Sequence, residues 1–347
     1  MKQVLIPNKG GYKANLHAHT TDSDGKLTPE EACKYYKEHG YSILAITDHL
    51  FMRDRSSLNT KDFVCLSGFE NNIIDWNPYA EFPKARNPLE VKCYHLNFYS
   101  PDPKKANLVG IVKYFYDFFT KHLSEEIKSQ CHFATEFFPN EYSRELAQKA
   151  IDEGLAQGYL VQYNHPSWSN QTECDYLGLK GLTSMEMVNT GSFINGFAEN
   201  NEYVYDLMLR DGQHICCTAN DDNHNLDSNN DDSFYSFNIM FPKKLTYESV
   251  FECLKEGNLY CSTGPLFNEI YVENNIVYVS TKDDVAGIYM STNGQYAKGV
   301  LRKEKPLLNA QFVLKDAVTY FRIKIKDKNG NHAYTRAYFR SEEGLWK

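Results

Sequence analysis

The chain has 347 residues, a formal net charge of −8 and a hydrophobic fraction of 42%, values typical of a globular protein that can bury a large core. An acidic chain without a basic run does not attract a phosphate backbone, which argues against bulk nucleic-acid binding. No stretch approaches the ~20 apolar residues of a membrane span, and no signal-peptide segment is visible at the N-terminus.

The first predicted unit is a strand, a helix and a second strand. Residues 12–19 predict a strand that ends in a His-x-His pair. The Thr-Pro-Glu-Glu segment at 28–31 predicts a helix start, because it combines a capping box with proline at the first helical position. The apolar run 42–46 predicts a buried parallel strand. These residues therefore predict a βαβ unit, whose functional edge is the carboxyl end of its strands.

The alternation of strands and helices continues to about residue 266. Further strands are expected over 63–69, 91–99, 159–163, 182–188, 214–218 and 234–241, and further helices over 107–122, 141–157, 202–210 and 246–256. Such regular alternation predicts an α/β fold built as a parallel barrel or a layered sheet.

From about residue 268 the helical period disappears, and short strands alternate with Asn- and Gly-rich turns. Strands are expected over 270–272, 276–280, 287–291, 311–314, 320–326 and 333–338. This pattern predicts a small all-β sandwich. We therefore expect two domains, residues 1–266 and 267–347.

Metal-ligand residue types stand at the predicted strand ends. His17 and His19 share one side of a strand because side chains repeat every two residues, and Asp24 can return to the same place past a turn. The full set is His17, His19, Asp24, His49, Glu70, His95, His165, Asp222 and His224. Histidine with carboxylate and without thiolate suits Zn, Mn or Fe. The sequence therefore predicts a metal cluster.

Five motifs in this order resemble the PHP (polymerase and histidinol phosphatase) superfamily. They are Leu-His-Ala-His-Thr with Ser-Asp-Gly, then Ile-Thr-Asp-His, Gly-Phe-Glu, Asn-His-Pro and Asp-Asn-His, all within residues 12–266. The Tyr-x-Ser-Thr-Gly-Pro segment at 260–265, followed by the β domain, is similar to the CehA/McbA-like branch. The resemblance implies a distorted (β/α)7 barrel with two or three divalent metals at its carboxyl end.

The resemblance also implies how the ligands divide among the metals. His17, His19, Glu70 and Asp222 would hold the first; Glu70 would bridge to a second, completed by His95 and His165; and Asp24, His49 and His224 would hold a third. Asp221 stands where the family usually has a small residue, but the spacing still pairs Asp222 with His224. Glu70, Asp222 and His224 are the expected catalytic residues, as ligands that position a hydroxide.

The expected chemistry is hydrolysis of a small phosphomonoester or phosphodiester by metal-bound hydroxide. Three carboxylates balance half the charge of three divalent cations, which leaves roughly +3 to attract a phosphate. We expect Arg53, Asn164 and Asn189 to contact substrate. Glu186 is expected to orient ligands or substrate, and Asp48 to accept a proton from a ligand histidine.

Two alternatives stay open. The same metals could cleave a non-phosphorus ester or a carbamate, or the chain could be a non-catalytic binding protein with a vestigial barrel. The expected partner is a small phosphorylated molecule, with no membrane and no nucleic acid beyond nucleotides or short oligonucleotides. Nine scattered cysteines without a C-x-x-C pair predict free buried thiols in a reducing compartment. We therefore expect a cytoplasmic protein; a secreted or periplasmic one whose signal had been removed would share these features.

Overall fold

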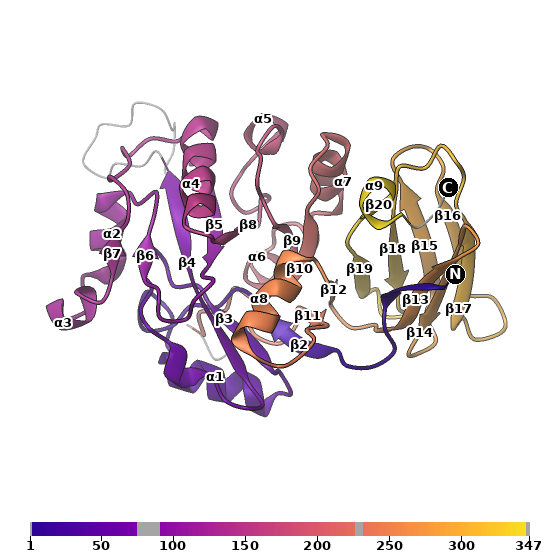
Figure 1. The fold of residues 1–347 in the computed structure, drawn as a ribbon, viewed down its shortest axis with the longest axis horizontal. Coiled ribbons are helices and arrows are strands. Elements are labelled where there is room, and N and C mark those ends of the chain that lie inside the picture. Colours follow the sequence, from indigo (N-terminus) through magenta and orange to yellow (C-terminus); the bar gives the residue numbers. More distant parts are fainter. Residues whose placement is uncertain (1, 75–90, 226–231, 345–347) are drawn as a thin grey trace.

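The computed structural model describes residues 2–74, 91–225 and 232–344 (Figure 1). Its main feature is one large mixed sheet, in the order β10-β9-β8-β5-β4-β3-β2-β11-β12-β19-β18-β15-β16, with β20 paired to β18. The strands of its N-terminal part are β2 (Tyr12–Asn15), β3 (Ile43–Ile46), β4 (Val64–Ile74), β5 (Cys93–Tyr99), β8 (Leu160–Tyr163), β9 (Ser184–Asn189), β10 (Cys216–Asn220), β11 (Phe237–Met240) and β12 (Leu259–Ser262). The predicted mixed α/β class is therefore confirmed.

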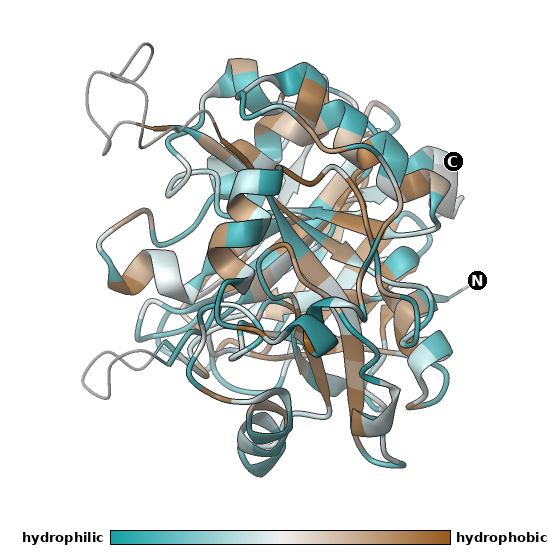
Figure 2. Ribbon diagram, turned by 90° about the vertical axis from the view of Figure 1, so that its left-hand side faces the viewer, coloured by the Kyte–Doolittle hydropathy of each residue, from teal (hydrophilic) through white to brown (hydrophobic). Residues whose placement is uncertain are grey.

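The helices lie outside this sheet and are mostly short. They are α1 (Pro29–Glu38), α2 (Lys113–Thr120), α3 (Glu125–Lys128), α4 (Arg144–Ala156), α5 (Glu173–Tyr176), α6 (Thr190–Ile194), α7 (Glu202–Arg210), α8 (Tyr247–Lys255) and α9 (Arg340–Glu343), with a 3-10 turn over Ser56–Leu58. Figure 2 shows hydrophilic and hydrophobic bands alternating along the outer helices, as expected of amphipathic helices that cover a core.

Two predicted helices illustrate what sequence signals establish. The capping box of α1 forms as predicted, because Thr28 Oγ1 accepts from Glu31 N at 3.2 Å and Glu31 Oε2 accepts from Thr28 N at 2.9 Å. The helix expected over 107–122 is shorter than predicted. Its first residues instead form β6 (Asn107–Leu108), which pairs with β7 (His132–Phe133), so α2 begins only at Lys113.

The strand directions depart from a uniform parallel pattern. β2, β3 and β4 are parallel, as are β8, β9 and β10. Between these two sets, β5 runs antiparallel to both β4 and β8. β11 is antiparallel to β2 and to β12. An antiparallel neighbour needs no crossover helix, so these pairs lack the repeated strand–helix–strand unit of a regular (β/α) barrel. The (β/α)7 barrel therefore stays what the resemblance implies.

The C-terminal part consists almost entirely of strands, as predicted. They are β13 (Phe267–Glu273), β14 (Ile276–Thr281), β15 (Gly287–Thr292), β16 (Lys298–Leu301), β17 (Asn309–Val313), β18 (Tyr320–Lys326), β19 (His332–Thr335) and β20 (Tyr338–Phe339). A four-stranded sheet has the order β1-β13-β14-β17, and β19 joins the other strands to β12. The sandwich form and the boundary at residue 266 stay predictions.

The N-terminal strand belongs with these C-terminal strands. β1 (Gln3–Ile6) pairs antiparallel with β13, so both chain ends lie at one end of the molecule (Figure 1). Ile6 and Tyr260 pack in the same hydrophobic cluster as Ile270 and Phe321. The core of the β region is thus completed by residues from both sides of the predicted boundary.

The cysteines match the prediction of free thiols. All nine are unpaired, and only Cys174 is exposed. Within the described ranges, no helix is long and apolar enough to cross a membrane.

A buried ion cluster joins α7 to β18. Arg322 is 1% exposed and donates to Asp206 Oδ1 and Oδ2, at 2.9 and 3.0 Å, and to Glu202 Oε1 at 2.7 Å. Lys324 Nζ reaches Glu202 Oε2 at 2.9 Å. Because the guanidinium is held from both acids, this cluster fixes the β region against the helix.

Arg322→Ala should lower the free energy of unfolding by about 2–3 kcal/mol. The substitution leaves two partly buried carboxylates without their main partner, which costs less than a fully buried pair because water can reach them. Chemical denaturation measures the effect. Lys324→Ala, which removes a more exposed cation from the same cluster, should cost less than about 1 kcal/mol. Equal losses for the two variants would contradict the assigned role of Arg322.

Candidate metal centre

The candidate ligands gather at one edge of the large sheet. His17, His19, His49 and His165 follow strand ends, whereas Glu70 lies within β4 and His95 within β5, which differs from the predicted placement at strand ends. Isolated parallel bridges join Ala18 to Asn223 and His49 to Glu70 just beyond the paired strands. The amide of Asp222 donates to His17 O at 3.0 Å. Asp222 has a positive φ of 53°, uncommon for a residue with a side chain. These backbone contacts bring residues from distant parts of the chain to one edge.

His17 and His19 point to the same place, as the strand period predicts. Their Nε2 atoms are 3.2 Å apart. His17 Nε2 lies 3.3 Å from Glu70 Oε1 and 3.2 Å from Asp222 Oδ1. His19 Nε2 lies 3.0 Å from Asp222 Oδ1 and 3.4 Å from Glu70 Oε2. These four residues form one group whose ligand atoms lie within 4.8 Å of one another, and we call it the inner group.

Glu70 is the centre of the cluster. His95 Nδ1 and His165 Nε2 approach its Oε1, at 3.2 and 3.3 Å. His49 Nδ1 approaches its Oε2 at 3.1 Å. The carboxylate is 1% exposed. Its two oxygens therefore face histidine nitrogen atoms rather than water. This is the geometry expected of a carboxylate that bridges two metal ions.

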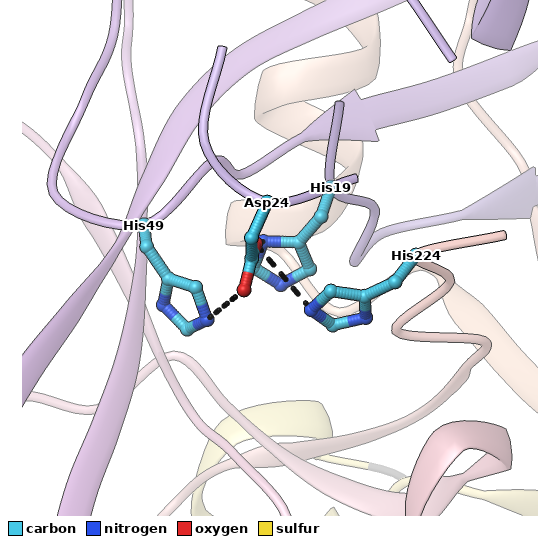
Figure 3. Close-up of side chains that lie close together, drawn as sticks. All are labelled: His19, Asp24, His49 and His224. Atoms are coloured by element: carbon cyan, nitrogen blue, oxygen red, sulfur yellow. Dashed lines mark ion pairs between the residues drawn. The ribbon is translucent and has the colours of Figure 1, made fainter. Parts of the chain in front are cut away.

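A second group, the outer group, consists of His19, Asp24, His49 and His224 (Figure 3). Asp24 lies between the three rings. Its Oδ1 is 3.5 Å from His224 Nε2 and 3.7 Å from His19 Nδ1, and its Oδ2 is 3.8 Å from His49 Nε2. The Asp24 side chain is 39% exposed. The outer group is therefore the part of the cluster that solvent reaches.

Several buried ligand atoms lack a hydrogen bond. Among the described residues, Glu70 Oε2, Asp222 Oδ1 and His49 Nδ1 are buried without a hydrogen-bond partner, although ion-pair distances surround them. A buried carboxylate oxygen without a partner is costly. Divalent cations would satisfy these atoms, and the donor set of imidazole and carboxylate suits Zn, Mn or Fe. The residues present therefore fit a metal cluster.

The charges of the cluster are strongly coupled. Burial alone would lower the pKa of His19, but the carboxylates of Asp222 and Glu70 raise it to about 10. Burial lowers the pKa of His49 to about 3. For Asp222, burial would raise the pKa, but the neighbouring His17 and His19 hold it well below its usual range. A proton on His19 lies between carboxylates where a cation could bind, so metal binding would release that proton.

Glu186 orients two ligands from behind. Its Oε1 lies 3.1 Å from His17 Nδ1 and accepts from Asn220 Nδ2 at 2.9 Å. Its Oε2 accepts from His165 N at 3.1 Å and Asn189 Nδ2 at 2.8 Å. Both oxygens of Glu186 therefore contact candidate metal ligands or asparagines that lie beside them. A carboxylate on the far nitrogen of a ligand histidine fixes the tautomer that leaves Nε2 free to ligate.

Glu186→Gln should weaken metal binding by the inner group roughly tenfold to a hundredfold, because the amide cannot accept from His17 Nδ1 on one side and keep the other contacts on the opposite side. Competition with a chromophoric chelator measures the affinity. Glu199→Gln, on an exposed acid, is the matched control and should match the wild type. An unchanged affinity in Glu186→Gln would show that the carboxylate has no positioning role.

The second and third ligand sets can be compared with the structure. His95 and His165 both reach Glu70, as the second set requires. However, His95 also groups with His49 and Glu70, and His165 with His17 and Glu186. The third set, Asp24 with His49 and His224, is brought together and gains His19. His19 thus belongs to both groups. The resemblance implies that it binds the first metal alone.

Two other expected roles, those of Arg53 and Asp48, differ from the observed contacts. Arg53 forms a two-point ion pair with Asp22, at 2.7 and 3.1 Å, and does not line the cavity at the cluster. Asp48 accepts from Thr20 and from Arg55, with no bond to a ligand histidine among the described contacts. Arg53 and Asp48 therefore support the loop that carries Asp24.

The two asparagines expected to contact substrate hold ligands instead. Asn164 Nδ2 donates to Glu70 Oε1 at 2.7 Å. Asn189 Nδ2 donates to Asp222 Oδ2 at 3.1 Å as well as to Glu186. Each side chain therefore orients a carboxylate of the inner group. A direct contact with substrate stays a prediction for both.

A cavity of about 310 Å³ opens onto the cluster. Metal-ligand residues of both groups line one side, and Ile74, Phe115, Phe118, Phe119 and Trp168 line the other. This apolar wall is not among the sites that the sequence predicts. Its signals are the three phenylalanines of the aromatic helix α2 and a tryptophan three residues after His165.

Comparisons with known proteins give a limited result. No family model matches the chain, and no curated protein matches it. A two-domain protein from Bacteroides vulgatus, described as containing a predicted PHP-like metal-dependent phosphoesterase, is 12% identical, with a TM-score of 0.44 over 97% of this chain and 98% of that one.

Two further solved structures are similar over a smaller part of the chain. A protein from Bifidobacterium adolescentis, inferred to be a metal-dependent phosphoesterase, is 14% identical, with a TM-score of 0.36 over 70% of this chain and 95% of that one. An amidohydrolase from Chromobacterium violaceum, with bound sulfate and no metal, is 14% identical, with a TM-score of 0.38 over 63% of this chain and 90% of that one. Within this chain, the ligand-type residues of the five sequence motifs meet in one cluster.

Proposed function

We propose that the protein is a metal-dependent phosphoesterase of the PHP superfamily that hydrolyses a small phosphomonoester or phosphodiester. The observation that supports this most strongly is the convergence of nine ligand-type residues from separate parts of the chain in one cluster, seven of which line the cavity. A vestigial site has no reason to keep buried carboxylate oxygens without partners. This favours an active centre over the alternative of a non-catalytic binding protein.

The residues would divide the work by position. Bound divalent ions would supply Lewis-acid polarisation of phosphoryl oxygens and a lowered pKa for a coordinated water. Glu70 would join the inner and outer groups, with Asn164 holding its Oε1. Glu186 would keep His17 in the tautomer that presents Nε2 to the cluster. Asp24 and His224, the partly exposed members, would face incoming substrate.

Electrostatics support an anionic substrate. Three carboxylates, Asp24, Glu70 and Asp222, would leave a net charge of roughly +3 beside three divalent cations, or +1 beside two, before any other anion is bound. Such a centre attracts a phosphoryl group from water and holds it in a mostly buried position. Bound cations held by these carboxylates and histidines would therefore supply most of the positive charge that attracts the reacting group.

One observation favours a second candidate, hydrolysis of a non-phosphorus ester or carbamate. Among the described residues that line the cavity, none is a lysine or an arginine. A phosphate would thus depend on the metals alone for its positive partners. A neutral carbonyl substrate would need no cationic side chain, and the same metals could polarise it.

A substrate panel distinguishes the two. The protein is loaded separately with Zn, Mn and Fe and assayed with p-nitrophenyl phosphate, bis(p-nitrophenyl) phosphate, p-nitrophenyl acetate and an aryl carbamate. We expect phosphoester turnover at least tenfold above that of the carbonyl substrates, lost on chelation. Faster turnover of the ester or carbamate with the same metal would contradict the proposed phosphoesterase.

A further inference from the structure

The cavity beside the cluster is divided between polar and apolar sides. On the apolar side, Phe119 stacks on the ligand ring of His49, with ring centres 4.3 Å apart and an interplanar angle of 29°. Trp168 lies with its ring centre 5.3 Å from that of His95 and 5.1 Å from that of His165. The apolar wall therefore begins at the ligands themselves, where the group attached to a bound phosphoryl group would lie.

Two aromatic residues of this wall are unusually open. Phe118 is 45% exposed and Trp168 is 38% exposed. Both line the cavity, together with the more buried Phe115 and Ile74. Exposed aromatic surface that borders a cavity marks a place where an apolar ligand gains by leaving water. A flat ring could contact the faces or edges of these side chains.

Two arginines of this region are paired with acids away from the cavity, and one lysine lies against a ring of the wall. Arg53 is paired with Asp22, and Arg55 is 1% exposed and paired with Asp22 and Asp48. Lys121 Nζ lies 4.5 Å from the centre of the Phe118 ring but is not among the residues that line the cavity. Among the described lining residues outside the metal ligands, none carries a positive charge that would match a second phosphate or a carboxylate on the substrate, and the amide of Asn72 is neutral.

We infer that the substrate carries one hydrolysable phosphoryl group joined to an uncharged leaving group with a planar apolar ring, which the wall of Ile74, Phe115, Phe118, Phe119 and Trp168 receives. This inference rests on the proposed phosphoesterase function and specifies its substrate class. Hydrolysis forms a bond from phosphorus to the oxygen of water and breaks the ester P–O bond, and the departing alkoxide takes up a proton and leaves as the ring-bearing alcohol. Nucleoside polyphosphates and carboxylated phosphates are disfavoured, because their extra charges would enter an apolar wall.

Matched ligands test the inference. Benzylphosphonate and methylphosphonate, which are not hydrolysed, are titrated into metal-loaded protein by calorimetry. The ring should strengthen binding roughly thirtyfold. Benzyl phosphate and ethyl phosphate, whose leaving alcohols are similarly basic, are compared as substrates and should show a similar ratio in kcat/KM. Phosphoglycolate should be at least tenfold poorer than ethyl phosphate.

Variants assign the preference to the wall. Phe118→Ala should reduce the benzyl-to-methyl ratio of affinities to less than about fivefold, and Trp168→Ala should reduce it as well. Tyr203→Ala removes a 67% exposed aromatic residue outside the wall, and should leave the ratio unchanged. A ratio that survives both wall substitutions would overturn the assignment to these residues.

The outcomes separate this inference from the function on which it rests. If both phosphonates bind equally well to wild-type protein and phosphoesters are hydrolysed, the ring-binding inference is overturned and the phosphoesterase stands. If neither phosphonate binds and no phosphoester is hydrolysed with any metal, the phosphoesterase itself is overturned, and the inferred substrate class falls with it.

Discussion

Glu70→Gln should remove most of the bound metal and lower kcat/KM by roughly a thousandfold or more. Both oxygens of this carboxylate face histidine nitrogens, His95 and His165 on Oε1 and His49 on Oε2. The amide keeps the size of the side chain but loses its negative charge and presents only one carbonyl oxygen. It therefore cannot bridge two cations. Metal content by elemental analysis and steady-state kinetics with the preferred phosphoester measure the two effects.

The matched control for this change is Glu141→Gln, which makes the same substitution on an exposed acid. It should retain wild-type metal content and rate. Circular dichroism of both variants tests whether the folds are intact. Full metal content and full activity in a folded Glu70→Gln protein would contradict the bridging role.

His17→Ala and Asp24→Asn should lose different metal ions. His17 belongs to the inner group and Asp24 to the outer group. His17→Ala should therefore empty the inner position and cost roughly a hundredfold or more in rate. Asp24→Asn should retain the inner ion, because the contacts of His17 with Glu70 and Asp222 do not involve Asp24.

Anomalous diffraction from crystals of the two loaded variants shows which position is empty. Asp62→Asn, on an exposed loop acid, is the matched control. It should keep every ion. Loss of the same ion from His17→Ala and Asp24→Asn would show that the inner and outer groups form one site.

The sequence predicts the ligand set better than it predicts the surrounding fold. His17 and His19 point to the same place, as a side-chain period of two predicts, although the strand expected over 12–19 ends at Asn15 and both residues lie beyond it. Asp222 and His224 have the same spacing, but Asp222 is reached through a positive φ. Most of the motifs follow a strand end and bring their ligand to one edge of the sheet, whereas the Gly-Phe-Glu motif lies inside β4, because that strand continues to Ile74.

The strand directions could not be derived in this way. An apolar run such as Cys93–Tyr99 looks the same whether its neighbour is parallel or antiparallel, yet β5 is antiparallel on both sides. Likewise, nothing local to Gln3–Ile6 indicates that it pairs with residues near 270. Long-range pairing depends on the packing of the whole chain, and a local pattern does not contain it.

The partners of charged side chains could also not be predicted from the sequence. Arg53, close after His49, satisfies the pattern of a substrate-binding arginine equally well whether or not an acid is near it. The structure places Asp22 against it. Asp22 is two residues from Asp24, so this ion pair and the Arg55 contact hold the loop of the outer group. Residue type alone could not separate substrate binding from this supporting role.

The most direct test of the central claim is elemental analysis of purified protein after saturation with Zn, Mn or Fe and removal of free metal, combined with hydrolysis of p-nitrophenyl phosphate by the same samples. The inner and outer groups predict at least two tightly bound ions per chain and phosphate release that rises with metal content and stops on chelation. Fewer than one ion per folded chain with every metal, or hydrolysis independent of metal content, would contradict the account.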